Sequence, residues 1–176
     1  PEDWLHWTRN AQNWNGMCAE CHSTNLRKNY DPATDSYETT WSEIDVSCEA
    51  CHGPGSHHVE WAEIPPMARP DLEDYGLVVS TETMSSRDEV ELCAPCHSRR
   101  TELGDYDHTR VPLLDNHLPA LLQEGLYHSD GQILDEVYVW GSFVQSKMYL
   151  KDVRCSDCHD VHSLKLHHEK NDLCLQ

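Results

Sequence analysis

The chain has 176 residues and a formal net charge of −18, with 31 acidic against 13 basic residues, and Leu, Ile, Val and its single Phe make up less than a fifth of it. So few bulky apolar side chains would bury too little surface to offset the conformational entropy of folding. Six Trp, seven Tyr and nine Cys nevertheless exclude a solvated acidic tail. The acidity also excludes nucleic acid as a partner. We therefore expect a core built around bound cofactors.

The first motif is CAECH at residues 18–22. A Cys-x-x-Cys pair followed at once by His is the attachment motif of c-type heme. One short helical turn sets both thiols against the two vinyl groups of a porphyrin, and the next residue presents its imidazole to the iron. Cys18 and Cys21 are thus predicted to form thioethers, with His22 as the proximal ligand. His6, upstream, is a candidate distal ligand.

The second motif, CEACH, follows at residues 48–52. It assigns two thioether cysteines and a proximal ligand, which are Cys48, Cys51 and His52. The Gly-Pro-Gly run that comes next predicts a helix that ends at Gly53 and a turn after it. Beyond that turn, either His57 or His58 can project onto another heme. Both are therefore candidates for distal ligation.

A third motif lies at the end of a predicted helix. Before this motif, Ser56 is expected to cap a helix over HHVEWAEI that stops at Pro65 and Pro66. Residues 65–85 are predicted to form a loop. Ser86 and Glu89 then form a capping box that opens a helix running into CAPCH at residues 93–97. This motif supplies two more thioether cysteines and a third proximal ligand, which are Cys93, Cys96 and His97.

The segment between the third and fourth motifs carries two candidate distal ligands. His117 precedes LPALLQEG, which predicts a short helix with Gly125 at its C-cap. His128 lies beside a turn, and the following QILDEVYVWGSF is expected to hold a short strand. Met148 could ligate iron through its thioether, but packing is the simpler interpretation.

The fourth motif is CSDCH at residues 155–159, which assigns Cys155 and Cys158 to thioethers and His159 to iron. His162 follows three residues later, too close in sequence to reach the far face of the same iron. As a ligand it would cap a neighboring heme, which requires two porphyrins in close contact. Cys174 stands two residues from the end. We interpret it as a truncated fifth attachment site, with a lone thiol as the alternative.

Other uses of paired cysteines explain the pattern less well. Zinc ribbons need no histidine directly after each pair, and a disulfide framework needs neither the histidine nor the fixed spacing. The motifs are unevenly spaced, so they do not define a structural repeat. We predict a single multiheme cytochrome c domain over residues 1–176, mostly α with much irregular loop, whose core is formed by packed hemes. No apolar run reaches membrane-spanning length.

Several stretches resemble the heme region of large bacterial multiheme cytochromes c in which tetratricopeptide repeats follow the hemes. They are WNGMCAECHSTNL, VSCEACHGPGSHHVEWA, YHSDGQILDEVYVWGSFVQSKMY and VRCSDCHDVHSLKL. The chain is more distantly similar to the tetraheme carriers that accept electrons from hydroxylamine oxidation in nitrifying bacteria. The resemblance implies distal ligands at His58, His128 and His162. No helical repeat of the tetratricopeptide kind is visible in this sequence.

The function expected from four heme c groups, with a fifth if Cys174 completes a motif, is electron transfer. Bis-histidine ligation leaves no open iron position, so we expect a carrier and not an enzyme. Heme c is attached outside the bacterial cytoplasmic membrane, so the chain should be a mature or excised piece of a periplasmic or extracellular protein. Its negative charge favors basic redox proteins as partners.

Two alternatives remain open. An iron without a distal residue could reduce or oxidize a small nitrogen or sulfur compound, with a nearby side chain as proton source. Subunits could also stack into an extracellular conducting filament, in which a histidine of one subunit completes a heme of the next. The surplus histidines near the two ends, His6, His167 and His168, permit that arrangement.

Overall fold

The computed structural model describes residues 2–3, 5–9, 12–105 and 112–175. The chain divides into two compact units. Unit 1 consists of Pro1–Glu82 with Glu102–Asn116, and unit 2 of Thr83–Thr101 with His117–Gln176. The expectation of a single domain over residues 1–176 stays a prediction, and each unit is described by itself.

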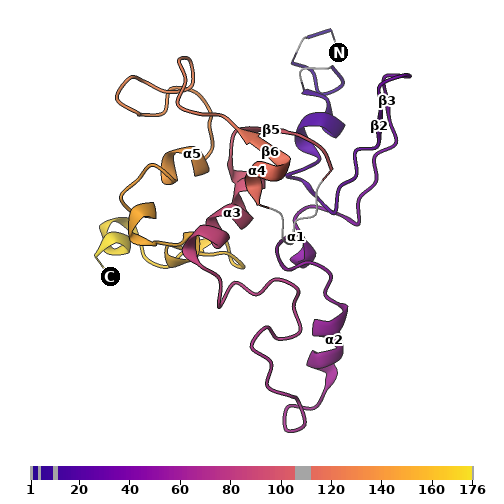
Figure 1. Ribbon diagram of the computed structural model, residues 1–176, viewed down its shortest axis with the longest axis vertical. Helices are drawn as coiled ribbons and strands as arrows, with labels where there is room; N and C mark the ends of the chain where they lie inside the picture. Colours follow the sequence, from indigo (N-terminus) through magenta and orange to yellow (C-terminus); the bar gives the residue numbers. More distant parts are fainter. Residues whose placement is uncertain (1, 4, 10–11, 106–111, 176) are drawn as a thin grey trace. The chain divides into compact units, whose positions relative to one another are not determined.

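Unit 1 is built from short elements joined by long irregular segments (Figure 1). Its helices are α1 (Cys48–His52), α2 (Ser56–Glu63) and α4 (Leu113–Asn116), preceded by the π-helical turn η2 (Trp14–Cys18). Strand β1 (Ser23–Thr24) pairs antiparallel with β4 (Glu43–Ile44), and β2 (Tyr30–Asp31) pairs antiparallel with β3 (Ser36–Tyr37). The loop after α2 folds back along that helix, where the Trp61 indole donates to the Pro70 carbonyl over 2.8 Å.

Unit 2 contains the longest helix among the described residues, α3 (Ser86–His97), and the short helix α5 (Trp140–Phe143). Three 3₁₀ turns follow, which are η3 (Tyr149–Lys151), η4 (Cys155–Asp157) and η5 (Lys170–Cys174). Strand β7 (His159–Asp160) pairs antiparallel with β8 (Lys165–Leu166). Strand β6 (His117–Pro119) also belongs to this unit, whereas β5 (Arg100–Glu102) has its last residue in unit 1.

Two expected helix ends are confirmed, and four other expectations are corrected. Helix α1 ends at His52 with Gly53 at φ 70°, a left-handed conformation that glycine adopts easily. Ser56 is the first residue of α2, and the N-cap is Gly55. The stretch QILDEVYVWGSF forms isolated β-bridges and helix α5 in place of the expected strand.

Ser86 was the expected N-cap of α3 but is its first helical residue. The N-cap is Ser85, whose Oγ accepts from the Asp88 amide. The stretch LPALLQEG is not helical. Pro119 ends strand β6, and the Ala120 amide donates to the Arg99 carbonyl over 2.7 Å.

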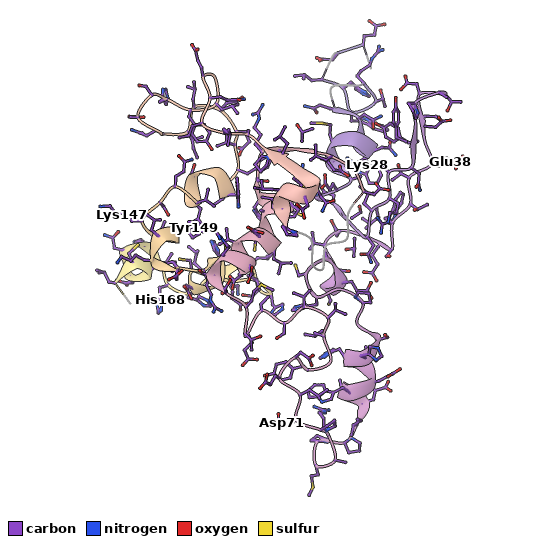
Figure 2. All side chains as sticks on the ribbon, viewed as in Figure 1. Lys28, Glu38, Asp71, Lys147, Tyr149 and His168 are labelled. Atoms are coloured by element: carbon purple, nitrogen blue, oxygen red, sulfur yellow. The ribbon has the colours of Figure 1, made fainter. Side chains whose placement is uncertain are left out.

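The polypeptide buries few apolar side chains. In unit 2, Leu126, Tyr127 and Val137 form a small buried cluster against which Ala120 packs. Many large apolar side chains are instead exposed, among them Met67, Leu164 and Leu175. Figure 2 shows side chains projecting from the irregular segments, including Asp71 in the loop beyond α2. Much apolar surface is therefore left for a cofactor to cover.

The fold class is correct in its loop content and less helical than expected. Helices account for 30% and strands for 15%, so irregular segments dominate. Among the helices in the described ranges, none is both long enough and apolar enough to cross a bilayer.

Candidate functional site: four heme attachment motifs

The first two motifs lie in unit 1, each on a short helical turn. Cys18 ends η2, whose N-cap Asn13 accepts from the Gly16 amide over 3.1 Å, and His22 leads directly into β1. In the second motif, α1 contains the whole CEACH sequence. Residues three and four apart lie on one face of a helix. The side chains of Cys48, Cys51 and His52 are therefore placed to bind one ligand.

A buried threonine connects these two motifs. The Thr24 hydroxyl donates to the Asp45 carbonyl over 2.9 Å and accepts from the Ser47 amide over 3.0 Å, and the Thr24 side chain is 0% exposed. The Asp45 amide donates to the His22 carbonyl over 2.9 Å. Ser47 directly precedes the second motif. The pairing of β1 with β4 thus brings the end of one attachment site to the start of the next.

His52 has the hydrogen bond that a metal-binding imidazole needs. Its Nδ1 lies 2.8 Å from the Val79 carbonyl. A carbonyl can only accept, so the proton is on Nδ1 and the lone pair is on Nε2. Such a bond fixes both the tautomer and the ring orientation of a ligating histidine. The arrangement suits the predicted role of His52 as a proximal ligand.

His58, on α2, carries the same kind of bond. Its Nδ1 lies 2.8 Å from the Tyr75 carbonyl, which again leaves the lone pair on Nε2. The carbonyl is aimed by a tight turn in which Tyr75 and Gly76 have φ of 54° and 74°. A Cβ on Gly76 would come within 3.0 Å of the His57 carbonyl oxygen. Only glycine therefore allows the loop to approach α2 this closely.

The third and fourth motifs lie together in unit 2. CAPCH forms the last turns of α3, with Pro95 inside the helix, and CSDCH spans η4 and the start of β7. A hydrogen bond from the Cys93 thiol lowers the pKa of Cys155, so the two motifs meet through one cysteine from each. Burial raises the pKa of Cys51 in the second motif and of Cys158 in the fourth.

The carboxylate of Glu89 joins the same two motifs. Its two oxygens accept from the Ser156 amide over 2.8 Å and the Ser156 hydroxyl over 2.9 Å. The Glu89 side chain belongs to α3, whereas Ser156 lies between the two cysteines of the fourth motif. The expected capping-box role of Glu89 is therefore replaced by a bond to a distant segment.

The candidate distal ligands occupy different settings. His128 and His162 lie exposed in turns, and His6 is half-buried with its Nδ1 2.9 Å from the Thr8 hydroxyl. His117 is 2% exposed on β6. His57 is exposed near Glu60. His167 uses its Nε2 to bond the Ser156 carbonyl over 2.9 Å. His108 lies outside the described residues.

Two further residues named from the sequence are also placed. Cys174 ends η5 and is exposed, and its charge is among the smaller causes that raise the pKa of Cys158. Met148 is half exposed at the start of η3.

The residues fit covalently attached heme c. Each motif offers two thiols and an imidazole within one short turn, and none of the nine cysteines, all of which are described, forms a disulfide. The Nδ1 bond of His52 places the lone pair on Nε2, as ligation of iron through that atom requires. Apolar side chains that the polypeptide leaves exposed, such as Ile44 at 57% and Met17 at 59%, are suited to the faces of a porphyrin.

Sequence reasoning missed the residues that connect the motifs. Thr24, Tyr75 and Glu89 act through tertiary contacts, and a lone threonine, a loop tyrosine and a helical glutamate have no local pattern that would distinguish them. By contrast, the Gly-Pro-Gly run and the prolines after α2 are recognizable in the sequence, and they predicted where α1 and α2 end.

Comparisons with known proteins agree with this site. The family model for cytochrome c554 and c-prime matches residues 6–53, which hold the first two motifs. The crystal structure of outer cell wall cytochrome OcwA is similar with a TM-score of 0.56 and 17% identity, over 93% of this chain and 43% of that one. The chain thus spans less than half of that protein, and the likeness is one of fold. A search of curated proteins finds no match.

The motifs, the family match and the shared fold together support one class of protein. Over the part that the family model matches, the chain resembles multiheme c-type cytochromes, and the shared fold supports the same class. The family match and the shared fold also support heme c as the cofactor.

Proposed function

We propose that the chain transfers electrons through four covalently bound hemes, held at Cys18–His22, Cys48–His52, Cys93–His97 and Cys155–His159. The observation that carries the proposal is the arrangement of the motifs in two connected pairs. Thr24 and the β1–β4 pairing connect the first pair, and the bonds from Glu89 to Ser156 connect the second. When bound, each heme supplies a one-electron iron couple whose potential depends on its ligands and surroundings.

The roles of the protein residues follow from their placement. The cysteines hold each porphyrin edge to a short turn, and the proximal histidines bind iron from the same turn. The Val79 carbonyl orients the His52 ring and raises its basicity as a ligand. The acidic surface, with a net charge of −18, steers basic redox proteins toward the molecule.

For distal ligation we propose His58 first, because the Tyr75 carbonyl already holds its ring as a ligand requires. His128 and His162 are exposed and can turn toward a neighboring heme, and His6 and His117 remain further candidates. His58→Ala should open one iron and produce a high-spin ferric signal in electron paramagnetic resonance. His57→Ala is the matched control, since the neighboring imidazole has no such carbonyl bond. An unchanged low-spin spectrum in His58→Ala would remove His58 from the ligand set.

We propose a periplasmic or extracellular location, supported by the fold shared with an outer cell wall cytochrome. The attachment chemistry points the same way, because heme c is joined to the chain outside the cytoplasmic membrane. Detection of the native protein in a spheroplast or surface-protease fraction would support this location, and its recovery with cytoplasmic markers would contradict it.

The deciding experiment for the whole proposal is a pyridine hemochrome assay per polypeptide together with intact mass. Four covalent hemes and reversible voltammetry would support an electron carrier. A colorless protein would refute the proposal. A persistent high-spin signal in the wild-type protein would favor an enzyme acting on a small nitrogen or sulfur compound, and filaments in electron micrographs would favor a conducting polymer. A fifth heme would require Cys174 to belong to a further motif.

A further inference from the structure

Glu89 is a buried carboxylate on the helix that carries the third motif. Its side chain is 4% exposed, although glutamate is almost never fully buried unless it is paired. It lies four residues before Cys93, so the carboxylate and the first thiol of CAPCH share one face of α3. This residue is not part of the attachment motif.

The partners of Glu89 come from the fourth motif. Its Oε1 accepts from the Ser156 amide over 2.8 Å, its Oε2 accepts from the Ser156 hydroxyl over 2.9 Å, and the Arg154 guanidinium lies 4.0 Å from Oε2. The first amides of a helical turn have no acceptor within the turn itself. Glu89 thus supplies to η4, from a different segment, the acceptor that a local N-cap would normally provide.

The connection acts where the two motifs already meet. Ser156 is adjacent to Cys155, and the turn η4 that contains both residues packs against α3. A rotation of η4 about this contact would break both bonds to Glu89. The bonds from Glu89 to Ser156 and the packing of η4 against α3 together leave η4 little freedom to turn relative to α3.

We propose that Glu89 is a positioning residue that sets the separation and mutual orientation of the third and fourth hemes. It acts through Ser156, by holding the turn that carries Cys155 and Cys158 against α3. The inference rests on the proposed function, because it concerns two of the four hemes. Electron transfer between redox groups depends steeply on their separation, so such a residue would determine the coupling within this pair.

The test compares Glu89→Ala with Glu91→Ala in the heme-loaded protein. Glu91→Ala removes the same charge from the same helix without touching Ser156. Both variants should retain four hemes by mass. Glu89→Ala should lose part of the Soret circular dichroism couplet that arises from closely packed hemes, and one or two midpoint potentials should shift in voltammetry. Glu91→Ala should reproduce the wild-type couplet and potentials.

Two further variants keep the proposal open to refutation if Glu89→Ala matures poorly. Glu89→Gln retains an acceptor oxygen for the Ser156 amide and should keep the hemes and most of the couplet. Ser156→Ala removes only the hydroxyl bond and should weaken the couplet partially. A wild-type couplet and wild-type potentials in fully loaded Glu89→Ala would overturn the inference. Loss of the fourth heme from both Glu89 variants, with Ser156→Ala unaffected, would also overturn it, because charge and not hydrogen bonding would then be required.

The failure of this inference can be told apart from failure of the proposed function. Fewer than four hemes on the wild-type chain would refute the four-heme carrier. Four hemes on the wild type with spectra indifferent to Glu89 would refute only the positioning role.

Discussion

The two units connect their motif pairs in different ways. In unit 1, backbone pairing of β1 with β4 and one threonine hydroxyl join the first attachment site to the second. In unit 2, a carboxylate reaches from α3 to Ser156, 67 residues further along the chain. Backbone ladders tolerate most side-chain changes, whereas a buried carboxylate can be removed by a single substitution. The first pair is therefore expected to be robust and the second sensitive to mutation.

The largest effect is expected from deleting one attachment site in each unit. Cys48→Ala with Cys51→Ala should remove one heme by intact mass and abolish hydrogen-exchange protection within unit 1. Cys155→Ala with Cys158→Ala should do the same in unit 2, because each heme replaces apolar core that the side chains do not supply. Each double variant should leave protection in the other unit intact. Loss of protection in both units would instead show that residues 1–176 fold as the single domain predicted from sequence.

A smaller effect is expected from a substitution in the buried apolar cluster of unit 2. Val137→Ala should destabilize this unit by about 2 to 3 kcal/mol, through lost burial and a residual cavity next to Leu126 and Tyr127. Val139→Ala is the control, since Val139 is exposed on the same segment. Hydrogen exchange of the amides in unit 2 measures the change. Equal effects of the two substitutions would mean that the heme faces, and not this cluster, stabilize the unit.

Thr24→Val tests the link within unit 1. Valine keeps the shape of threonine but leaves the Ser47 amide without its acceptor, at a cost of about 1 to 2 kcal/mol. Thr40→Val, at an exposed position of the same unit, should be close to neutral. Denaturant unfolding monitored by heme absorbance compares the two variants. Because the β1–β4 pairing survives, the Soret couplet should change less in Thr24→Val than in Glu89→Ala. The opposite order would mean that the first motif pair is the more sensitive to mutation.

The smallest effect is the pH dependence of two exposed hairpin turns, one in each unit, where an aspartate accepts hydrogen bonds from the turn. The Thr34 hydroxyl and the Ala33 amide lower the pKa of Asp31 in unit 1, and the Ser163 hydroxyl chiefly lowers that of Asp160 in unit 2. A carboxyl with a lowered folded-state pKa stabilizes the turn above its unfolded pKa of about 4. This contribution is lost as the pH falls through the folded value. Amide NMR shifts of both turns should therefore titrate in acid, and Asp31→Asn should abolish the titration only in unit 1.

Local chemistry explains which features could be predicted from sequence. The attachment sites were predicted because each is contained in five consecutive residues. The ends of α1 and α2 were predicted because Gly53 and the prolines after α2 act on their own backbone. LPALLQEG was predicted incorrectly. Its helix propensity is weaker than the bond from the Ala120 amide to the Arg99 carbonyl and the packing of Ala120 on the buried cluster of unit 2. The cap of α3 was misplaced by one residue because Ser85 and Ser86 have the same capping chemistry.

The amino-acid sequence alone predicted the cofactor class, the four attachment sites and their proximal ligands, because covalent heme chemistry needs its thiols and imidazole within one turn. Tertiary structure decided which sites are neighbors, through Thr24 in one unit and Glu89 in the other. It also singled out His58 among the candidate distal ligands, by the carbonyl that holds its ring. Contacts of this kind join residues tens of positions apart, and their geometry exists only after the chain has folded.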